Sequence, residues 1–366
     1  MSAAPRSLRA PAHRPAAQAR LAKGPVKDFD NRVTAQGDSL LNVVDLAVTF
    51  DSQEGTVHAV SGVSFAIQPG ETVGLVGESG CGKSISALAV LGLVRMMSNS
   101  TIRGRVEFMG RDLLALPESE VRGVRGRDMA MIFQDPVTSL NPVLSIERQM
   151  TEGIENHLGM SHADAVKRSI ELLETVGIPK AAERLHDYPH QFSGGMRQRV
   201  MIAIALSCNP KLLLADEPTT ALDVTIQAQI LHLMKQLSRD YGAAIMLITH
   251  DLGVVAGMTE RILVMYAGRI VESATARELF SHPHHPYTVG LLRSVPRLDE
   301  PRKETLQSIE GLPPDLAHLP PGCAFAPRCV LRTEQCRRER PELEPTTPGR
   351  LSACFHSDKL VATAVA

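Results

Sequence analysis

A glycine-rich stretch between a predicted strand and a predicted helix constrains this chain more than any other feature. It reads Gly-Glu-Ser-Gly-Cys-Gly-Lys-Ser over residues 77–84, behind the apolar run Val73–Val76 and ahead of the helix-forming run Ile85–Val94. Glycines let successive backbone N–H groups point at one anion, and the helix N-terminus that follows favours negative charge. The stretch therefore predicts a phosphate-binding loop in an α/β fold.

The loop predicts binding of a nucleoside triphosphate. Lys83 is placed to reach the β- and γ-phosphates, and the Ser84 hydroxyl is placed to ligate Mg²⁺. The remaining residues expected around the phosphates are Gly77, Glu78, Ser79, Gly80, Cys81 and Gly82. A chance glycine-rich turn is the alternative, but every fixed position of the pattern is matched in the right local context.

Two adjacent carboxylates end a second predicted strand. Asp216 and Glu217 follow the apolar residues 212–215, and Pro218 cannot continue the strand's hydrogen bonding. Ligands bind at the carboxyl ends of strands in an open parallel sheet, so both acids are expected near the nucleotide. Asp216 suits Mg²⁺, and Glu217 is then free to deprotonate the water that attacks the γ-phosphate. The alternative is an exposed acid pair without a catalytic role.

Two polar residues at other strand ends are weaker candidates. His250 follows the predicted strand 243–249 and would contact the γ-phosphate, while Gln134 follows residues 131–133 and could ligate Mg²⁺ and the attacking water. A lone histidine in such a place is usually a surface residue. Both assignments therefore gain support only from the other candidate residues of the nucleotide site.

A second glycine pair opens a predicted helix at Phe-Ser-Gly-Gly-Met-Arg-Gln-Arg, residues 192–199. Ser193 is a candidate N-cap, and Gly194 and Gly195 leave backbone amides accessible to a phosphate. A simple ATPase does not need two such surfaces, so the second one is expected to face a nucleotide held by another subunit. A capped helix without a ligand is the alternative.

Composition and patterning divide the chain. Residues 1–38 are predicted to be a disordered tail, because residues 1–27 carry basic side chains, several prolines and no acid; an import peptide is the alternative. Residues 39–280 are predicted to form the ATPase domain, β-rich at first, with a helical subdomain inserted at about 116–205. A C-terminal extension is expected over 281–358, rich in Pro, Arg and Cys, with a short tail at 359–366.

The charge balance and the apolar runs limit the partners. The formal net charge is −1, which gives no bulk electrostatic reason to expect nucleic acid. The apolar runs fall well short of the roughly 18 to 20 residues that a membrane helix needs. Any membrane role is therefore expected to be peripheral, through a partner.

Four of the six cysteines lie close together near the C-terminus: Cys323, Cys329, Cys336 and Cys354. Their spacing matches no standard zinc finger or ferredoxin run. Four thiols so close together in a cytosolic chain favour a metal site over disulfides. Thiolate ligands suit both zinc and an iron–sulfur cluster, so both remain open.

In this order, these parts resemble the ATP-binding subunit of ABC transporters. Residues 77–84 match the Walker A motif, Gln134 the Q-loop, 193–195 the signature motif, 212–217 the Walker B motif, 221–223 the D-loop and His250 the switch histidine. The predicted fold class is α/β: a P-loop NTPase core with an antiparallel β subdomain, an inserted helical subdomain and a small Cys-rich extension. The resemblance also makes Asp223 a nucleotide-binding candidate and Phe50 the aromatic that stacks on adenine, with His58 as a weaker choice.

A narrower resemblance is to the oligopeptide/dipeptide importer subfamily, in the subunit type with a Phe-Ser-Gly-Gly-Met signature. It is carried by residues 192–199, 133–142, 285–288 and the region from Gly322 to Cys354, and it covers about residues 40 to 358. Met196 departs from the glutamine of the commoner signature, which removes a hydrogen-bonding amide there. The resemblance implies a [4Fe–4S] cluster at the four cysteines, with zinc as the runner-up.

This subfamily also implies partners and a location. Two ATPase subunits would close head to tail on two ATP molecules, with Ser193 of each touching the γ-phosphate that the other holds, most simply as a heterodimer. Two integral membrane permeases and an external solute-binding protein complete the assembly, at the cytoplasmic face of the inner (plasma) membrane.

The expected function is ATP hydrolysis coupled to the import of di- or oligopeptides. Uptake of a nickel complex or glutathione is the first alternative. A non-transport ABC ATPase of DNA repair or the ribosome is the second, but such proteins usually show a long coiled coil or two ATPase domains in one chain, and neither pattern occurs here. A binding module with inactive sites is disfavoured by Lys83, Glu217 and His250.

Overall fold

The computed structural model describes residues 39–53, 55–220, 223–294 and 309–361. The tail predicted at residues 1–38 and most of the one predicted at 359–366 lie outside the described residues. Within the described part, no helix is long and apolar enough to cross a membrane.

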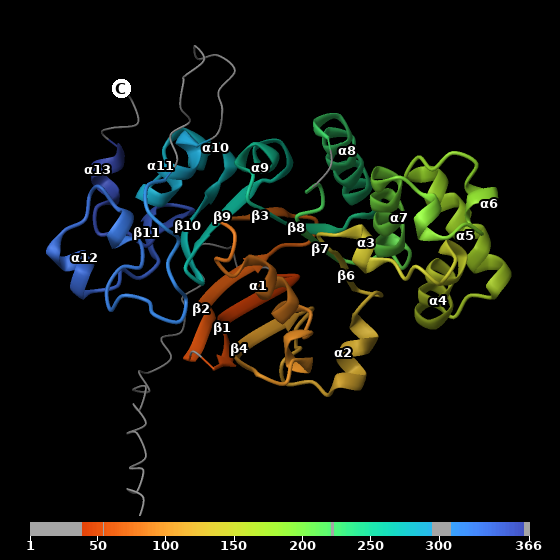
Figure 1. Cartoon of the computed structure of the whole chain (residues 1–366), viewed down its shortest axis with the longest axis horizontal. Helices are drawn as coiled ribbons and strands as arrows, with labels where there is room; N and C mark the ends of the chain where they lie inside the picture. Colours follow the sequence, from red (N-terminus) through yellow and green to blue (C-terminus); the bar gives the residue numbers. More distant parts are fainter. Residues whose placement is uncertain (1–38, 54, 221–222, 295–308, 362–366) are drawn as a thin grey trace, which may run out of the picture. The chain divides into compact units, whose positions relative to one another are not determined.

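An eight-stranded sheet runs through the described chain in the order β11-β12-β10-β9-β3-β8-β7-β6 (Figure 1). Strands β6, β7, β8, β3 and β9 are parallel neighbours, whereas β10, β12 and β11 continue the sheet in antiparallel pairs. The bounds are β3 Thr72–Val76, β6 Met129–Ile132, β7 Leu212–Asp216, β8 Ala244–Thr249, β9 Arg261–Tyr266, β10 Arg269–Thr275, β11 Glu344–Thr347 and β12 Arg350–Ser352. The parallel pairing brings the carboxyl ends of β3, β6, β7 and β8 to one edge of the sheet.

A second sheet packs its own core against one face of the first. Its order is β2-β1-β4-β5, with every pair antiparallel: β1 Leu41–Ser52, β2 Gly55–Ile67, β4 Ser100–Phe108 and β5 Arg111–Asp112. Its buried side chains form one cluster with α1 (Lys83–Val90) and with Val73, Leu75 and Met246 of the main sheet. The β-rich start predicted for the ATPase domain is confirmed by β1 and β2.

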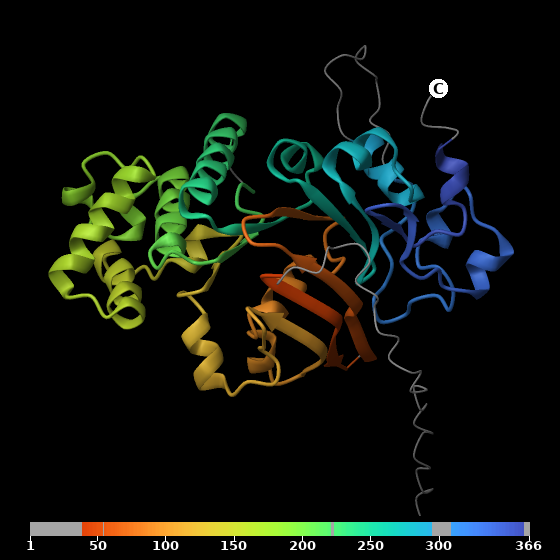
Figure 2. The same cartoon turned by 180° about the vertical axis from the view of Figure 1, so that it is seen from behind.

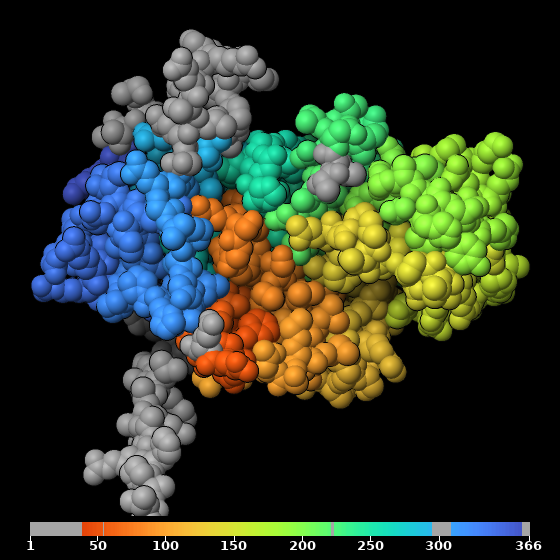
Figure 3. Space-filling view, viewed as in Figure 1, coloured from red at the N-terminus to blue at the C-terminus, as the bar shows by residue number. Residues whose placement is uncertain are grey.

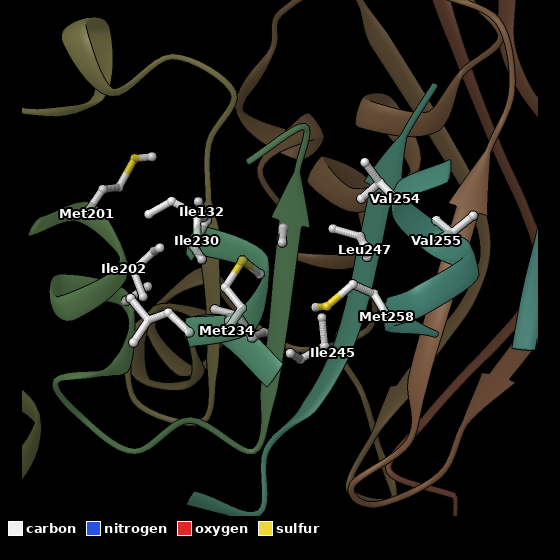
Figure 4. Packing of buried hydrophobic residues seen from close by; sticks show 14 of the residues in the cluster. Ile132, Met201, Ile202, Ile230, Met234, Ile245, Leu247, Val254, Val255 and Met258 are labelled. Atoms are coloured by element: carbon white, nitrogen blue, oxygen red, sulfur yellow. The ribbon is translucent and has the colours of Figure 1, made fainter. Parts of the chain in front are cut away.

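Alternation along the parallel strands gives each face of the main sheet its own core. Ala244, Met246 and Ile248 of β8 face the second sheet, while Ile245 and Leu247 point to the opposite side. There they meet side chains of α7, α8 (Val224–Tyr241) and α9 (Leu252–Met258), as Figure 4 shows. The two clusters explain why these strands are continuous apolar runs rather than alternating ones.

A group of helices follows β6, and Figures 1 and 2 both show it at that edge of the sheet. It comprises α3 Pro136–Ser139, α4 Ile146–Leu158, α5 His162–Thr175, α6 Ala181–Arg184 and α7 Gly194–Leu206. Ser145, Ser161 and Ser193 cap α4, α5 and α7 with their hydroxyls, as serine does at helix N-termini. The helical range predicted at about 116–205 is wrong in its first part. There, α2 (Glu118–Val124) is followed by β6, a four-residue strand that belongs to the main sheet.

The C-terminal part joins the main sheet and shares its core. It contributes α10 Ala276–Ser281, α11 Pro286–Arg293, α12 Glu334–Arg338 and α13 Ser357–Val361, besides β11, β12 and a 3₁₀ turn at Ala326–Arg328. Two further 3₁₀ turns lie earlier in the chain, at Val94–Met96 and Pro189–Gln191. Phe325, Cys329 and Ala353 belong to the same buried cluster as the parallel strands. The described residues beyond 281 therefore contribute to the core of the sheet that carries the predicted site.

Candidate functional site

The loop between β3 and α1 has little room for side chains at two of its glycines. A Cβ at Gly77 would overlap the carbonyl oxygen of Met265, and one at Gly82 would overlap that of Ala59. Gly82 also has a φ of +106°, which side chains rarely allow. The neighbouring backbone thus fixes the glycine pattern. The helix predicted at Ile85–Val94 begins earlier, at Lys83, and ends at Val90.

Lys83 carries a buried ammonium group without an acidic partner. Its Nζ donates to the carbonyl oxygens of Gly77 and Glu78, at 2.8 and 2.9 Å, and its side chain is buried. Among the described residues it forms no ion pair with a carboxylate. A buried cation that is hydrogen-bonded only to its own loop fits an anionic ligand, because a phosphate would supply the missing negative charge.

Ser84 and Asp216 place oxygen atoms side by side at the carboxyl ends of the strands. The Ser84 hydroxyl donates to Asp216 Oδ1 at 3.0 Å. Burial raises the pKa of Asp216, although the Ser84 hydrogen bond opposes this shift. A hydroxyl and a carboxylate are the ligand types that Mg²⁺ prefers, so this donor set fits the predicted ion.

Glu217 gathers the remaining polar residues at the same edge of the sheet. Its carboxylate accepts from Gln134 Nε2 at 3.1 Å and lies 3.1 Å from His250 Nδ1. The Thr220 hydroxyl donates to it at 2.9 Å. Glu217 also has a φ of +45°, a conformation that costs free energy outside glycine and that often marks a functional residue. The structure thus brings together Gln134, Glu217 and His250 from the ends of three strands.

The structure keeps other predicted residues apart from this cluster. Ser193 caps α7, and no hydrogen bond in the described part of the chain joins residues 193–195 to residues 77–84. Asp223 caps α8 through Ile226 N–H at 2.9 Å, whereas Ala221 and Leu222 of the predicted D-loop lie outside the described residues. Phe50 is half-buried against the second-sheet core, and His58 is exposed. The residues predicted to form a second phosphate surface therefore have no hydrogen bond to this chain's own phosphate loop among the described residues.

The four C-terminal cysteines line one pocket together with His285, Phe325 and His356. Burial, with a smaller contribution from the neighbouring cysteines, raises the pKa of Cys354 to about 12. Their chemistry fits a thiophilic cation, which would favour thiolates. However, no group of three or more His, Cys, Asp or Glu side chains in the described ranges is arranged to hold a metal ion. Among the described residues, the ready-made four-cysteine site expected from the sequence is therefore not seen.

Sequence reasoning missed two residues that touch the phosphate loop. The Tyr287 hydroxyl accepts from the backbone N–H of Glu78 at 2.7 Å, and Arg328 forms a two-pronged ion pair with the Glu78 carboxylate at 2.7 and 2.9 Å. Tyr287 lies in the motif 285–288, for which no contact was predicted. Nothing in the spacing of Arg328 points to a partner 250 residues away.

Comparison with known protein families and solved structures identifies the family to which this chain belongs. The family model described as "ABC transporter" matches residues 60–220, and the one described as "Oligopeptide/dipeptide transporter, C-terminal region" matches residues 271–336. The chain is 53% identical over 320 residues to the oligopeptide transport ATP-binding protein OppD of Escherichia coli K12, covering 87% of this chain and 94% of that one. The chain belongs to the ATP-binding subunits of the oligopeptide/dipeptide ABC transporter family.

Other similarities agree with this family. The chain is 50% identical over 328 residues to the dipeptide transport ATP-binding protein DppD of Bacillus subtilis 168, covering 90% of this chain and 98% of that one. A solved dimeric, post-hydrolysis structure of the ATP-binding cassette MJ0796 with ADP and Pi matches 65% of this chain and 99% of that one, with 28% identity and a TM-score of 0.57. These findings confirm the resemblance drawn from the sequence, and the chain is an ABC-type ATPase with a P-loop fold.

Replacing Glu217 by Gln tests the hydrolytic role of this ABC ATPase site. An amide cannot take a proton from water, so phosphate release should fall by at least about 100-fold while ATP binding persists. The exposed Glu260, changed to Gln, is a matched control that should leave the rate unaltered. Near-normal hydrolysis by Glu217→Gln would refute its role as the base.

Proposed function

We propose that this chain is the ATP-hydrolysing subunit of an importer for di- or oligopeptides. The observation that carries the proposal is the Gln134–Glu217–His250 cluster beside Ser84, Asp216 and the buried Lys83. Family membership supports the same conclusion. This proposal gives each site residue the role that the sequence analysis predicts for it.

Each polar side chain has a distinct task in hydrolysis. Lys83 and the loop N–H groups hold the β- and γ-phosphates, and Ser84, Asp216 and Gln134 would hold Mg²⁺, which neutralises phosphate charge when bound. Glu217 accepts the proton of the attacking water. His250 lies on the opposite carboxylate oxygen from Gln134 and orients that carboxylate.

The signature segment supports a nucleotide shared between two subunits. Ser193 caps the 13-residue helix that starts at Gly194, and Ser193 and Gly194 are exposed at an end that favours an anion. Met196 donates its N–H to the Ser193 hydroxyl, while its side chain packs on the core cluster rather than offering an amide to a ligand. A second ATPase subunit would bring its phosphate loop to this surface, and a heterodimer suits a chain with a modified signature. Asp223 and Phe50 would complete the nucleotide contacts.

An apolar surface next to Gln134 supports docking to membrane permeases. Phe133, Val137 and Val143 are 40%, 59% and 77% exposed, around α3 and immediately after β6. Exposed apolar side chains that gather in this way mark interaction sites. Gln134 lies between this surface and Glu217, so the state of the nucleotide can reach the permeases through it. The chain would then work at the cytoplasmic face of the inner (plasma) membrane, with an external solute-binding protein that supplies the cargo.

Peptide is the favoured cargo, since the chain matches proteins described as oligopeptide and dipeptide transport ATP-binding proteins. Nickel complexes and glutathione remain alternatives, because the ATPase subunit itself does not contact cargo. A non-transport role on nucleic acid finds no support in the helical segment after β6, where five short helices pack together without a coiled coil.

The cysteine pocket extends the proposal to a metal. Cys323, Cys329, Cys336 and Cys354 line one pocket in a region matched by the peptide-transporter C-terminal family as far as residue 336. We assign them a [4Fe–4S] cluster, with zinc as the alternative, in a structural or regulatory role.

Cys323→Ser tests this metal assignment. Losing one thiolate should remove iron and acid-labile sulfide together, measured on protein purified without oxygen, and the brown absorbance should disappear. Cys208→Ser is the control, because Cys208 is a free thiol that lies outside the cysteine pocket, beside Gly153 in the helical segment. Unchanged absorbance in Cys323→Ser would remove Cys323 from the ligand set, and zinc without sulfide would favour the alternative.

Reconstitution tests the assembly. The chain alone should hydrolyse ATP slowly, because its signature surface and its phosphate loop each need a partner. Adding the partner ATPase and the permeases in lipid should raise phosphate release, whereas adding nucleic acid should not. An unchanged rate on full reconstitution would count against this assembly.

A further inference from the structure

We propose that Tyr287 and Arg328, which lie outside the phosphate loop, are positioning residues that set its affinity for ATP by holding Glu78. This inference rests on the proposed ATP site and adds two residues to it. It also makes the C-terminal part of the chain a functional part of that site. Figure 3 shows the residues coloured blue, from 309 onward, beside the red and orange residues of the second sheet.

Arg328 holds the side chain of Glu78 with little freedom. Its Nη1 and Nη2 donate to the two carboxylate oxygens at 2.7 and 2.9 Å, and the two side chains are only 5% and 25% exposed. The guanidinium also donates to the backbone oxygens of Ile309 and Glu310, at 3.2 and 3.0 Å, and to the Tyr266 hydroxyl at 3.5 Å. Hydrogen bonding to Glu78 is the main cause of the raised pKa of Arg328. A fork of this kind fixes orientation as well as distance, which a lysine cannot do.

Tyr287 holds the backbone of the same residue. Its hydroxyl accepts from Glu78 N–H at 2.7 Å, and its ring is fully buried against Tyr266 and Phe325, with centroids 4.6 and 5.5 Å away. Burial raises the pKa of Tyr287, so the hydroxyl stays neutral. Tyr287 is the second residue of α11, where the His285 ring accepts its N–H at 3.1 Å.

A buried carboxylate anchors the start of α11 to the main sheet. Glu272 of β10 accepts the backbone N–H groups of His284 and His285, at 2.7 and 2.9 Å, and Arg350 of β12 lies 3.5 Å away. Because Glu272 is completely buried, this arrangement fixes Tyr287 relative to the sheet from which the loop emerges.

Glu78 passes these restraints on to the phosphate-binding residues. Its carbonyl oxygen accepts from Lys83 Nζ at 2.9 Å and, more weakly, from Cys81 N–H at 3.4 Å. The amide, carbonyl and carboxylate of Glu78 are therefore all in use, and two of the three are held from outside the loop. A loop held in its binding shape loses less conformational entropy on binding phosphate, which raises affinity.

The test measures MgATP affinity and steady-state hydrolysis on the full chain with Arg328→Met, Arg328→Lys and Tyr287→Phe. Arg328→Met should weaken ATP binding about tenfold, the size expected for losing a charge-assisted hydrogen bond. KM should rise by a similar factor while kcat changes less than twofold, because neither residue contacts Glu217, Gln134 or His250. Tyr287→Phe should shift KM in the same direction.

Three comparisons decide the outcome. Arg332→Met is the matched control, since Arg332 is exposed and its guanidinium donates to the Pro327 carbonyl rather than to Glu78. In a Glu78→Gln background, Arg328→Met should have less than half of its effect on affinity, because Arg328 acts through that carboxylate. Thermal unfolding without nucleotide reports the purely structural contribution.

The possible results separate this inference from the proposed function. If Arg328→Lys and Tyr287→Phe fold and bind ATP as the unmodified chain does, the inference is overturned, even where the unfolding temperature falls. If the unmodified chain binds no ATP, both the inference and the proposed function fail. The inference is also overturned if Arg328→Met raises KM by the same factor in the Glu78→Gln background as in the unmodified chain.

Discussion

The buried ammonium of Lys83, hydrogen-bonded only within its own loop, is the interaction on which the rest of the site depends. An unpaired, buried cation at the carboxyl ends of parallel strands favours the binding of an anion. The carbonyl oxygens of Met265 and Ala59 exclude side chains at Gly77 and Gly82, so the shape of the loop depends on these glycines. Ser84, Asp216 and the Glu217 cluster then meet at the same edge, since their strands are parallel and in register.

Strand ends were the part of the site that the sequence predicted well. Short apolar runs followed by a polar residue located Gln134, Asp216, Glu217 and His250, because a buried parallel strand must end where its polar residues begin. Contacts between distant segments left no such signal. The partnership of Arg328 with Glu78 depends on how the C-terminal chain returns to β9 and β10, which no local pattern encodes.

The C-terminal region shows how composition can mislead about architecture. Its Pro, Arg and Cys content suggested an extension held together by a metal, yet β12 pairs with β10, and Phe325 and Ala353 lie in the main core. The region is thus stabilised by burial in the shared core and by the hydrogen bonds that Glu272 accepts from His284 and His285. It contributes directly to the surroundings of the phosphate loop.

A calorimetric titration of the intact chain with ATP, ADP and AMP in Mg²⁺ tests the central claim most directly. If Lys83 and the loop amides bind the β- and γ-phosphates, AMP should bind at least about 100-fold more weakly than ATP, the size expected for losing several charge-assisted hydrogen bonds. Lys83→Met should remove most of that preference. Equal affinity for AMP and ATP, or an unchanged preference in Lys83→Met, would contradict the account.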